Sequence, residues 1–235
     1  MDWSGVRAMV FDMDGTLLNT EEVIVSSASL TLQEWGHAPL PEGYRMPNMH
    51  GTAADLIEDV LQERGLPMPA QGKAYAGKAF EACYARYPAG MAPLYPGVRE
   101  WLQALKAAGV PLAVCTNKVH ALAIKGLEAH GILQCFDAVT GRDTCGIAKP
   151  APEPLLHTVQ QLGVAPAEIL YFGDTHADAA CAQAAGAAFA WFEAGFGDAR
   201  VATYPHRLAF TDYAALHRAW QGAQTVEAVV ASTGA

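Results

Sequence analysis

Short apolar runs alternate with helical patterns along most of this 235-residue chain, and that alternation restricts the possible folds more than any other feature. Six runs have the length and composition of buried strands: Val6–Phe11, Pro111–Thr116, Phe136–Thr140, Ile169–Phe172, Ala187–Phe192 and, more weakly, Arg207–Phe210. Helical patterns between them end at glycines, as in Gly97–Ala108, Leu155–Leu162 and Asp178–Ala185. The pattern predicts an α/β fold with a Rossmann-like, doubly wound and mostly parallel sheet.

Residues 19–93 differ from the rest of the chain, because they carry helical patterns and no convincing strand. Helices are expected directly after residue 19, over Ala53–Arg64 and over Gln71–Tyr87. Prolines and glycines then break the pattern between residues 88 and 96. We therefore expect an all-α cap domain at residues 19–93, inserted into an α/β core formed by residues 1–18 and 94–235.

Charge and cysteine usage exclude several classes of protein. The net charge of −9 argues against a broad nucleic-acid surface, since such binding needs many basic side chains. No apolar run is long enough for a membrane span, and the first residues do not have the pattern of a signal peptide. Five scattered cysteines without a C-x-x-C pair are typical of a reducing compartment, so we expect a cytoplasmic protein. No pattern indicates an oligomeric state.

The first candidate strand ends in two acids, in the stretch "FDMDGTLLNT". Residues i and i+2 of a strand point to the same side, so Asp12 and Asp14 are expected to share one face. Ligands of parallel α/β sheets lie beyond the carboxyl ends of the strands, and Mg²⁺ is the natural counter-charge for carboxylates there. Gly15 allows the backbone to approach a ligand closely, and Thr16 can donate a hydrogen bond. A plain turn is the alternative, because Asp-Gly is common in turns.

Two further segments are weaker signals by themselves. "AVCTNK" brings Thr116 and Asn117 to the end of the second strand, where they can hold a phosphoryl group, with Lys118 adding charge at the rim. "IAKPAPEPLL" offers Lys149 before a proline that keeps the chain extended. An ammonium ion there can neutralise phosphate and carboxylates together, although an isolated Lys-Pro is more often part of a surface loop.

The segment "ILYFGDTHADAACAQAAG" is a stronger signal. Asp174 follows a buried-looking strand, and Asp178 lies one helical turn later on the same face. We expect Asp174 to complete a metal site with Asp12 and Asp14. Asp178 can orient Lys149 or a metal-bound water, or can simply favour the N-terminus of its helix. His176, between the two acids, either contacts substrate or is a half-exposed loop residue.

The order D-x-D-G-T, T-N, K-P and G-D-x-x-x-D, with a helical insertion after the first motif, resembles the haloacid dehalogenase superfamily over nearly the whole chain. The resemblance implies that Asp12 is the nucleophile of an aspartyl-phosphate mechanism and that Asp14 is the general acid and base. It also implies that Thr116 holds the phosphoryl oxygens, that Lys149 offsets the charge, and that Asp12, the Asp14 carbonyl and Asp174 hold Mg²⁺.

Within that superfamily, the sequence favours a phosphatase. Dehalogenases lack the second acid of the first motif, which is present here as Asp14. The cap and the "KPAPEPL" stretch look most like phosphoglycolate phosphatases and other small-molecule phosphatases. Phosphomutases of the β-phosphoglucomutase type share the core motifs but tend to carry a cap-loop arginine after the glycine matching Gly51, which "MHGTAADLI" lacks. A catalytically silent binding protein is the third reading.

The substrate is expected to be a small phosphorylated metabolite, selected by the cap. His50 is the best candidate for a cap residue that reaches the substrate, because cap loops of the family lie over the active site. "GFGDAR", beginning at Gly195, lacks the third glycine of a dinucleotide-binding loop and is interpreted as a turn after a strand.

Overall fold

The computed structural model describes residues 3–233. Six strands form one parallel sheet: β1 (Ala8–Phe11), β2 (Leu112–Cys115), β3 (Ala138–Thr140), β4 (Ile169–Gly173), β5 (Ala188–Phe192) and β6 (Leu208–Phe210). Their spatial order is β3-β2-β1-β4-β5-β6, the order of a doubly wound Rossmann-like sheet. All six predicted strands are therefore confirmed, and β1 occupies the centre of the sheet beside β2 and β4.

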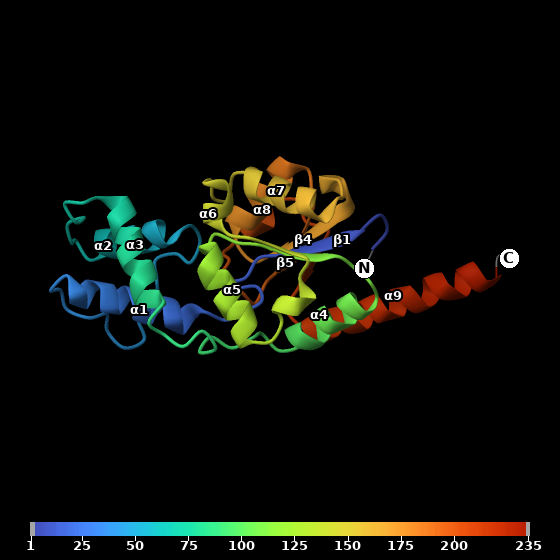
Figure 1. Cartoon of the computed structure of the whole chain (residues 1–235), viewed down its shortest axis with the longest axis horizontal. Coiled ribbons are helices and arrows are strands. Elements are labelled where there is room, and N and C mark those ends of the chain that lie inside the picture. Colours follow the sequence, from blue (N-terminus) through green and yellow to red (C-terminus); the bar gives the residue numbers. More distant parts are fainter. Residues whose placement is uncertain (1–2, 234–235) are drawn as a thin grey trace.

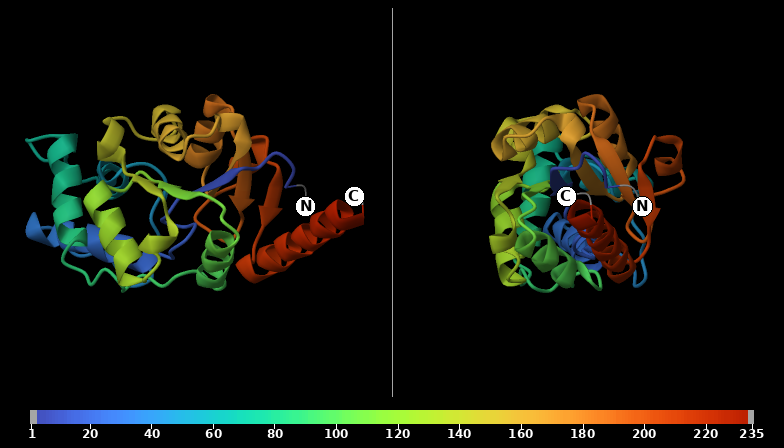
Figure 2. Two further views of the ribbon diagram at one scale, coloured as in Figure 1. Left: turned by 45° about the vertical axis from the view of Figure 1, so that its right-hand side comes forward. Right: turned by 90° about the vertical axis from the view of Figure 1, so that its right-hand side faces the viewer.

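Helices cover both faces of this sheet (Figures 1 and 2). One face packs against α4 (Val98–Ala107), α5 (His120–Ala129) and the long C-terminal α9 (Tyr213–Thr233). The other packs against α7 (Glu153–Leu162) and α8 (His176–Ala185). A short helix, α6 (Arg142–Cys145), follows β3, and three 3₁₀ turns lie at Leu133–Cys135, Pro166–Glu168 and Val201–Thr203. The burial of both faces explains why the strands are apolar almost throughout.

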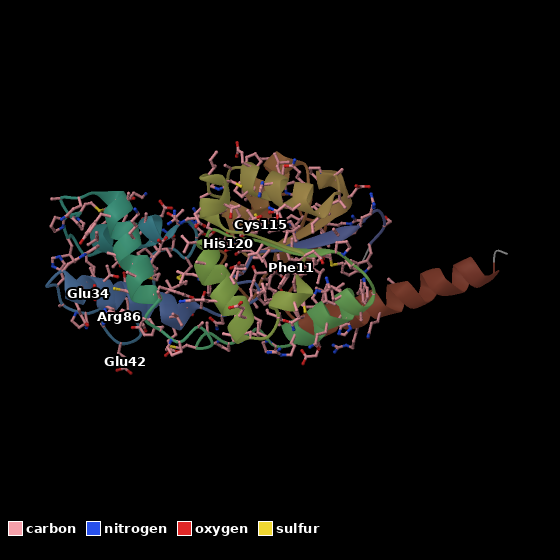
Figure 3. The ribbon with its side chains drawn as sticks, in the orientation of Figure 1. Phe11, Glu34, Glu42, Arg86, Cys115 and His120 are labelled. Atoms are coloured by element: carbon pink, nitrogen blue, oxygen red, sulfur yellow. The ribbon has the colours of Figure 1, made fainter. Side chains whose placement is uncertain are left out.

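Three helices form a separate layer beside the sheet: α1 (Glu21–Glu34), α2 (Ala53–Glu63) and α3 (Lys73–Tyr84) (Figure 1). Their apolar faces enclose a hydrophobic cluster of their own, in which Leu32, Ile57 and Val60 are fully buried. Arg86, which follows α3, forms an ion pair with Glu34, the last residue of α1, and both are labelled in Figure 3. The prediction of helices without strands in this interval is confirmed.

The chain passes between the two layers at two adjacent points. Leu18 and Leu94 form an antiparallel bridge, and the Asn19 N–H donates to the Pro93 carbonyl at 2.9 Å. A second bridge joins Asp14 to Leu18. The division into a core of residues 1–18 and 94–235 and a cap of residues 19–93 stays a prediction, and these contacts support it.

Several predicted helix bounds shift by one to three residues. The helix expected over Gln71–Tyr87 is shorter at both ends, because Gly72 at φ +83° stands before its first turn and the residue preceding Pro88 is unsuited to a helix. At α2, Thr52 and Asp55 form a reciprocal capping box that fixes the start. None of the helices in the described part of the chain is both long enough and apolar enough to cross a bilayer.

Candidate active site

The carboxyl ends of three neighbouring strands bring the predicted motifs together. Phe11 of β1 is in register with Val114 of β2 and with Phe172 of β4. Asp12 follows Phe11 directly, and its N–H donates to the Phe172 carbonyl at 2.8 Å. Thr116 and Asp174 each lie two residues beyond the registered position of their own strand, so all three side chains reach the same edge of the sheet. Figure 3 labels Phe11 and Cys115, the last residues of β1 and β2.

Asp12, Asp174 and Asp178 form a buried cluster of carboxylates. One oxygen from each lies within 4.8 Å of one from each of the others. Asp12 is 6 % exposed and Asp174 is fully buried. Three buried carboxylates at this separation repel one another strongly unless cations lie among them. The cluster therefore has the character of a cation site.

Lys149 supplies one of these cations from the loop before α7. Its Nζ donates to Asp12 Oδ1 at 2.7 Å and to Asp178 Oδ1 at 2.5 Å. The Cys115 carbonyl, at 3.2 Å, and the Tyr171 hydroxyl, at 2.9 Å, complete its surroundings. The ammonium group is thus fixed between two acids, and the predicted alternative of a free surface lysine is wrong.

The pKa values of the cluster follow from burial and from the position of that lysine. Burial raises the pKa of Asp12 to about 7, against the lowering effect of Lys149. Burial, then Asp178 and Asp12, raise the pKa of Asp174 well above its usual value. Burial acts in the same direction on Asp178, but the charge and hydrogen bond of Lys149 and bonds from Thr175 hold its pKa below the usual range. Lys149 is therefore shared between Asp178 and Asp12, and none of the ion pairs of the described residues includes Asp174.

Asp14 lies at the mouth of the cluster and is paired separately. Lys118 Nζ donates to both of its carboxylate oxygens, at 2.8 and 2.7 Å. The same ammonium lies 4.1 Å from the centre of the Tyr84 ring, which belongs to α3 of the helical layer. Lys118 is 8 % exposed in its side chain, so the expected rim cation is instead a buried partner of Asp14.

Gly15 and Thr16 pack against Asp174 and do not face an open part of the site. Thr16 is fully buried, and its hydroxyl donates to Asp174 Oδ1 at 2.7 Å. Gly15 has φ +84°, and a Cβ built there would lie 2.3 Å from Asp174 Oδ2. The close approach predicted for Gly15 is therefore to a carboxylate of the cluster, and Thr16 orients that carboxylate instead of facing a ligand.

A segment that the sequence analysis interpreted as a simple turn contributes to the same support. The Phe196 N–H donates to Asp174 Oδ2 at 2.6 Å. A Cβ at Gly195 would lie 2.3 Å from the Gly15 carbonyl, and one at Gly197 would lie 1.9 Å from the Asp174 carbonyl. The two glycines of "GFG" thus allow this loop to enclose Asp174. The two glycines can be seen in the sequence, but the reason for them becomes clear only from their contact with Asp174 in the structure.

Asn117 and Thr116 lie beside the cluster, as expected. Asn117 Nδ2 donates to the Lys149 carbonyl at 3.0 Å, and Asn117 Oδ1 accepts from the Lys149 N–H at 2.8 Å. Both polar ends of Asn117 therefore position the Lys149 loop. The Thr116 hydroxyl accepts from the Lys118 N–H at 3.3 Å, and Thr116 is among the residues that line the adjoining pocket.

His50 is one of several residues between 19 and 93 that reach this site. It lines the same pocket as Asp12 and Asp14, and its ring meets the ring of His176 edge to face with centroids 4.0 Å apart. His50 Nε2 also lies 2.8 Å from Nη2 of Arg200. Burial, then His176 and Arg200, lower the pKa of His50 to about 4, so the ring is neutral near pH 7. His176 contacts His50 and does not line the pocket.

The donor set fits a magnesium ion. Asp12 and Asp174 offer hard, buried carboxylate oxygens in a cluster where one ammonium group lies among three carboxylates, and such oxygens are the ligands that Mg²⁺ prefers. The carboxylate cluster contains Asp178 beside the predicted Asp12 and Asp174, and the carboxylate of Asp14 is paired with Lys118. The predicted contribution of the Asp14 carbonyl stays a prediction.

Comparisons with known proteins agree with this geometry. The family model of haloacid dehalogenase-like hydrolases matches residues 9–192. A phosphoglycolate phosphatase of Cereibacter sphaeroides is 35 % identical over 205 residues, covering 87 % of this chain and 93 % of its own. One of Chromobacterium violaceum is 33 % identical over 202 residues, covering 85 % and 90 %.

A solved structure is similar over the same extent. The crystal structure of a predicted phosphoglycolate phosphatase from Haemophilus somnus superimposes with a TM-score of 0.81 at 26 % identity, covering 92 % of this chain and 98 % of the other. The family match covers most of the sequence. It agrees with the sheet order, the helical layer and the position of Asp12 at the edge of the sheet. The chain belongs to the haloacid dehalogenase-like hydrolases.

Proposed function

We propose that the protein is a Mg²⁺-dependent phosphatase that hydrolyses a small phosphorylated metabolite through an aspartyl-phosphate on Asp12. The observation that carries this proposal is the buried cluster of Asp12, Asp174 and Asp178 with Lys149 among them. A lone nucleophilic carboxylate would repel a phosphate dianion, but here a lysine touches the nucleophile and a cation site adjoins it. The relatives named phosphoglycolate phosphatase support the same reaction class.

The residues of the chain divide the reaction between them. An oxygen of Asp12 attacks phosphorus, and the bond between phosphorus and the ester oxygen breaks. Asp14 gives its proton to the departing alcohol and then takes one from the water that attacks the aspartyl-phosphate, which releases inorganic phosphate and restores Asp12. Mg²⁺ held by Asp12 and Asp174, with the Asp14 carbonyl, would neutralise charge on the phosphoryl oxygens. Asp178 keeps Lys149 charged and in place.

Thr116 and the backbone at Gly15 and Asn117 are the proposed phosphate contacts. In this proposal the side chains of Thr16 and Asn117 position Asp174 and Lys149, since their polar atoms are already bonded there. Lys118 holds the carboxylate of Asp14 in the orientation needed for proton transfer. Its ammonium group bonds Asp14 and is not a proposed direct contact of the phosphate.

A phosphomutase of the β-phosphoglucomutase type is the nearest alternative. The cap-loop segment at Gly51 carries no arginine, and His50 occupies the position next to it with a neutral ring. Such a loop offers no charge to hold the second phosphate of a bisphosphate intermediate, so hydrolysis is favoured. A silent binding protein is disfavoured because Asp12, Asp14, Lys149 and Asp174 are all present.

The protein is also proposed to be cytoplasmic. All five cysteines are free thiols. Four of them, Cys83, Cys115, Cys135 and Cys181, are buried, which suits a reducing compartment. The fold places no constraint on the oligomeric state.

A screen of phosphorylated metabolites, including phosphoglycolate, tests the proposed reaction. Phosphate release should require Mg²⁺ and stop in EDTA. Asp12→Asn should lower kcat at least about 1000-fold with the circular dichroism spectrum unchanged, because the amide is not nucleophilic. Glu42→Gln is the matched control, since Glu42 is exposed at a cap loop (Figure 3) and should keep full activity. Activity that survives in Asp12→Asn would exclude Asp12 as the nucleophile.

A further inference from the structure

The pocket beside Asp12 has an apolar wall on its cap side. Each cap helix contributes carbon surface to it: Ile24 from α1, Leu56 from α2 and Phe80 from α3, each less than 10 % exposed overall. Met49 adds a thioether from the loop before α2. The phosphoryl end of a substrate must lie at Asp12, so its leaving group must lie against this wall.

The polar side chains that the cap brings to the pocket are all engaged by the core. His50 bonds Arg200 and is neutral near pH 7. Glu81 pairs with Arg142 of α6. Among the described residues that line the pocket, Tyr84 is the remaining polar one from the cap helices, and its ring lies under Lys118.

The cations of the pocket are paired as well. The lining residues include two lysines, Lys118 and Lys149, and no arginine. Lys118 bonds both oxygens of Asp14, while Lys149 bonds Asp12 and Asp178. A carboxylate on the leaving group would therefore lose its water against carbon atoms and the Glu81 carboxylate, with no unpaired cation to meet it.

We propose that the leaving group of the true substrate is short, uncharged and largely aliphatic, which refines the proposed phosphatase function and rests on it. An apolar wall favours binding of each methylene group and disfavours a charged group. The ratio of kcat/KM values between substrates that differ by one such group reaches about 10- to 200-fold. The cavity has a volume of about 70 Å³. Because about 10–15 Å³ of such space holds one water, the cavity is small, which favours a short leaving group.

The decisive comparison uses two esters of nearly equal shape. Isobutyl phosphate carries two methyl groups where phosphoglycolate carries two carboxylate oxygens. The wild-type enzyme with Mg²⁺ should hydrolyse isobutyl phosphate with a kcat/KM at least about tenfold higher. Calorimetric titration of the Asp12→Asn variant with the same two esters should show the same order of affinity, whether or not turnover is observed.

Two variants should reverse the preference. Met49→Arg places a cation on the half-buried rim of the wall, and Glu81→Gln releases Arg142 from its partner. Each should raise the relative kcat/KM for phosphoglycolate at least about tenfold. Gln62→Arg is the matched control, because it adds the same charge to an exposed position on α2 and should leave the ratio unchanged.

The outcomes separate this inference from the proposed function. Mg²⁺-dependent hydrolysis that favours phosphoglycolate in the wild-type enzyme overturns the inference and leaves the phosphatase standing. Hydrolysis of no ester in the metabolite panel overturns the phosphatase, and the affinities of the Asp12→Asn variant then decide the inference: tighter binding of phosphoglycolate refutes it.

Discussion

Replacing Lys149 by methionine should destabilise the metal-free protein in a pH-dependent manner. The substitution keeps an unbranched side chain of similar length and removes the ammonium group. Asp12 and Asp178 then lose the cation that lies 2.7 and 2.5 Å from them, and the Tyr171 hydroxyl and the Cys115 carbonyl lose a hydrogen-bond partner. Removing one partner of a buried ion pair costs about 3–5 kcal/mol, because the remaining charge stays buried.

The sign of the pH dependence follows from the two carboxyl groups. Without Lys149, burial raises the folded-state pKa of Asp12 further, and the pKa of Asp178 loses the main influence that holds it low, so that burial raises it as well. A carboxyl group with a raised folded pKa stabilises the fold at low pH, and this contribution is lost as the pH rises through the folded pKa. The cost should therefore be about 3–5 kcal/mol at pH 8 and about half of that or less at pH 5.

Urea unfolding in EDTA measures this cost at both pH values. In thermal unfolding, about 3–5 kcal/mol corresponds to a decrease in Tm of roughly 6–20 °C for a chain of this size. The double variant Lys149→Met with Asp178→Asn provides the control, since it removes one unpaired charge with almost no change in volume and should recover at least about 1 kcal/mol at pH 8. An equal loss at pH 5 and pH 8, with no recovery in the double variant, would refute the assignment of the cost to buried charge.

Two further perturbations address the cation site. Because the pKa of Asp12 is about 7 and burial also raises that of Asp174, protons compete with Mg²⁺, and Mg²⁺ should raise the Tm more at pH 8 than at pH 5; an equal shift would contradict this. Gly15→Ala should abolish the Mg²⁺-induced shift, since its Cβ would lie 2.3 Å from Asp174 Oδ2, whereas Gly36→Ala, at φ +80° but with open space around it, should keep the shift. Retention of the shift in Gly15→Ala would show that this contact is unimportant.

The sheet was predictable because its strands are buried on both faces and therefore read as continuous apolar runs. The helix over His120–Ala129 was not, because its alanines and Gly126 give it little amphipathic pattern, and only Ala123 and Leu127 pack deeply against the sheet. The C-terminal α9 was missed for a related reason. Tyr213, Leu216 and Trp220 are its buried anchors, and Asp212 caps its start by accepting from the Ala215 N–H at 2.8 Å, a signal that the sequence analysis did not use.

Asp12 and Asp174 were predictable because each directly follows a buried strand, and Asp14 and Asp178 lie a few residues further along the same segments. Their division of roles was not predictable, because it depends on pairs far apart in the sequence. Thr16 bonds Asp174 across 158 positions, and Lys118 bonds Asp14 across 104. No local pattern specifies that Lys118 is paired and buried, or that "GFG" packs on Asp174.

The bridges at Leu18 fix the backbone on both sides of the point where the cap leaves the core. Asp14 is joined to Leu18, and Leu18 is joined in turn to Leu94. The loop that carries the proposed catalytic residues Asp12 and Asp14 is thus closed on itself before α1 begins, so that its path is held by contacts outside the insertion. Natural variation in the length or composition of the insertion can then alter which molecules are accepted, while the loop that carries Asp12, the proposed nucleophile, keeps its shape.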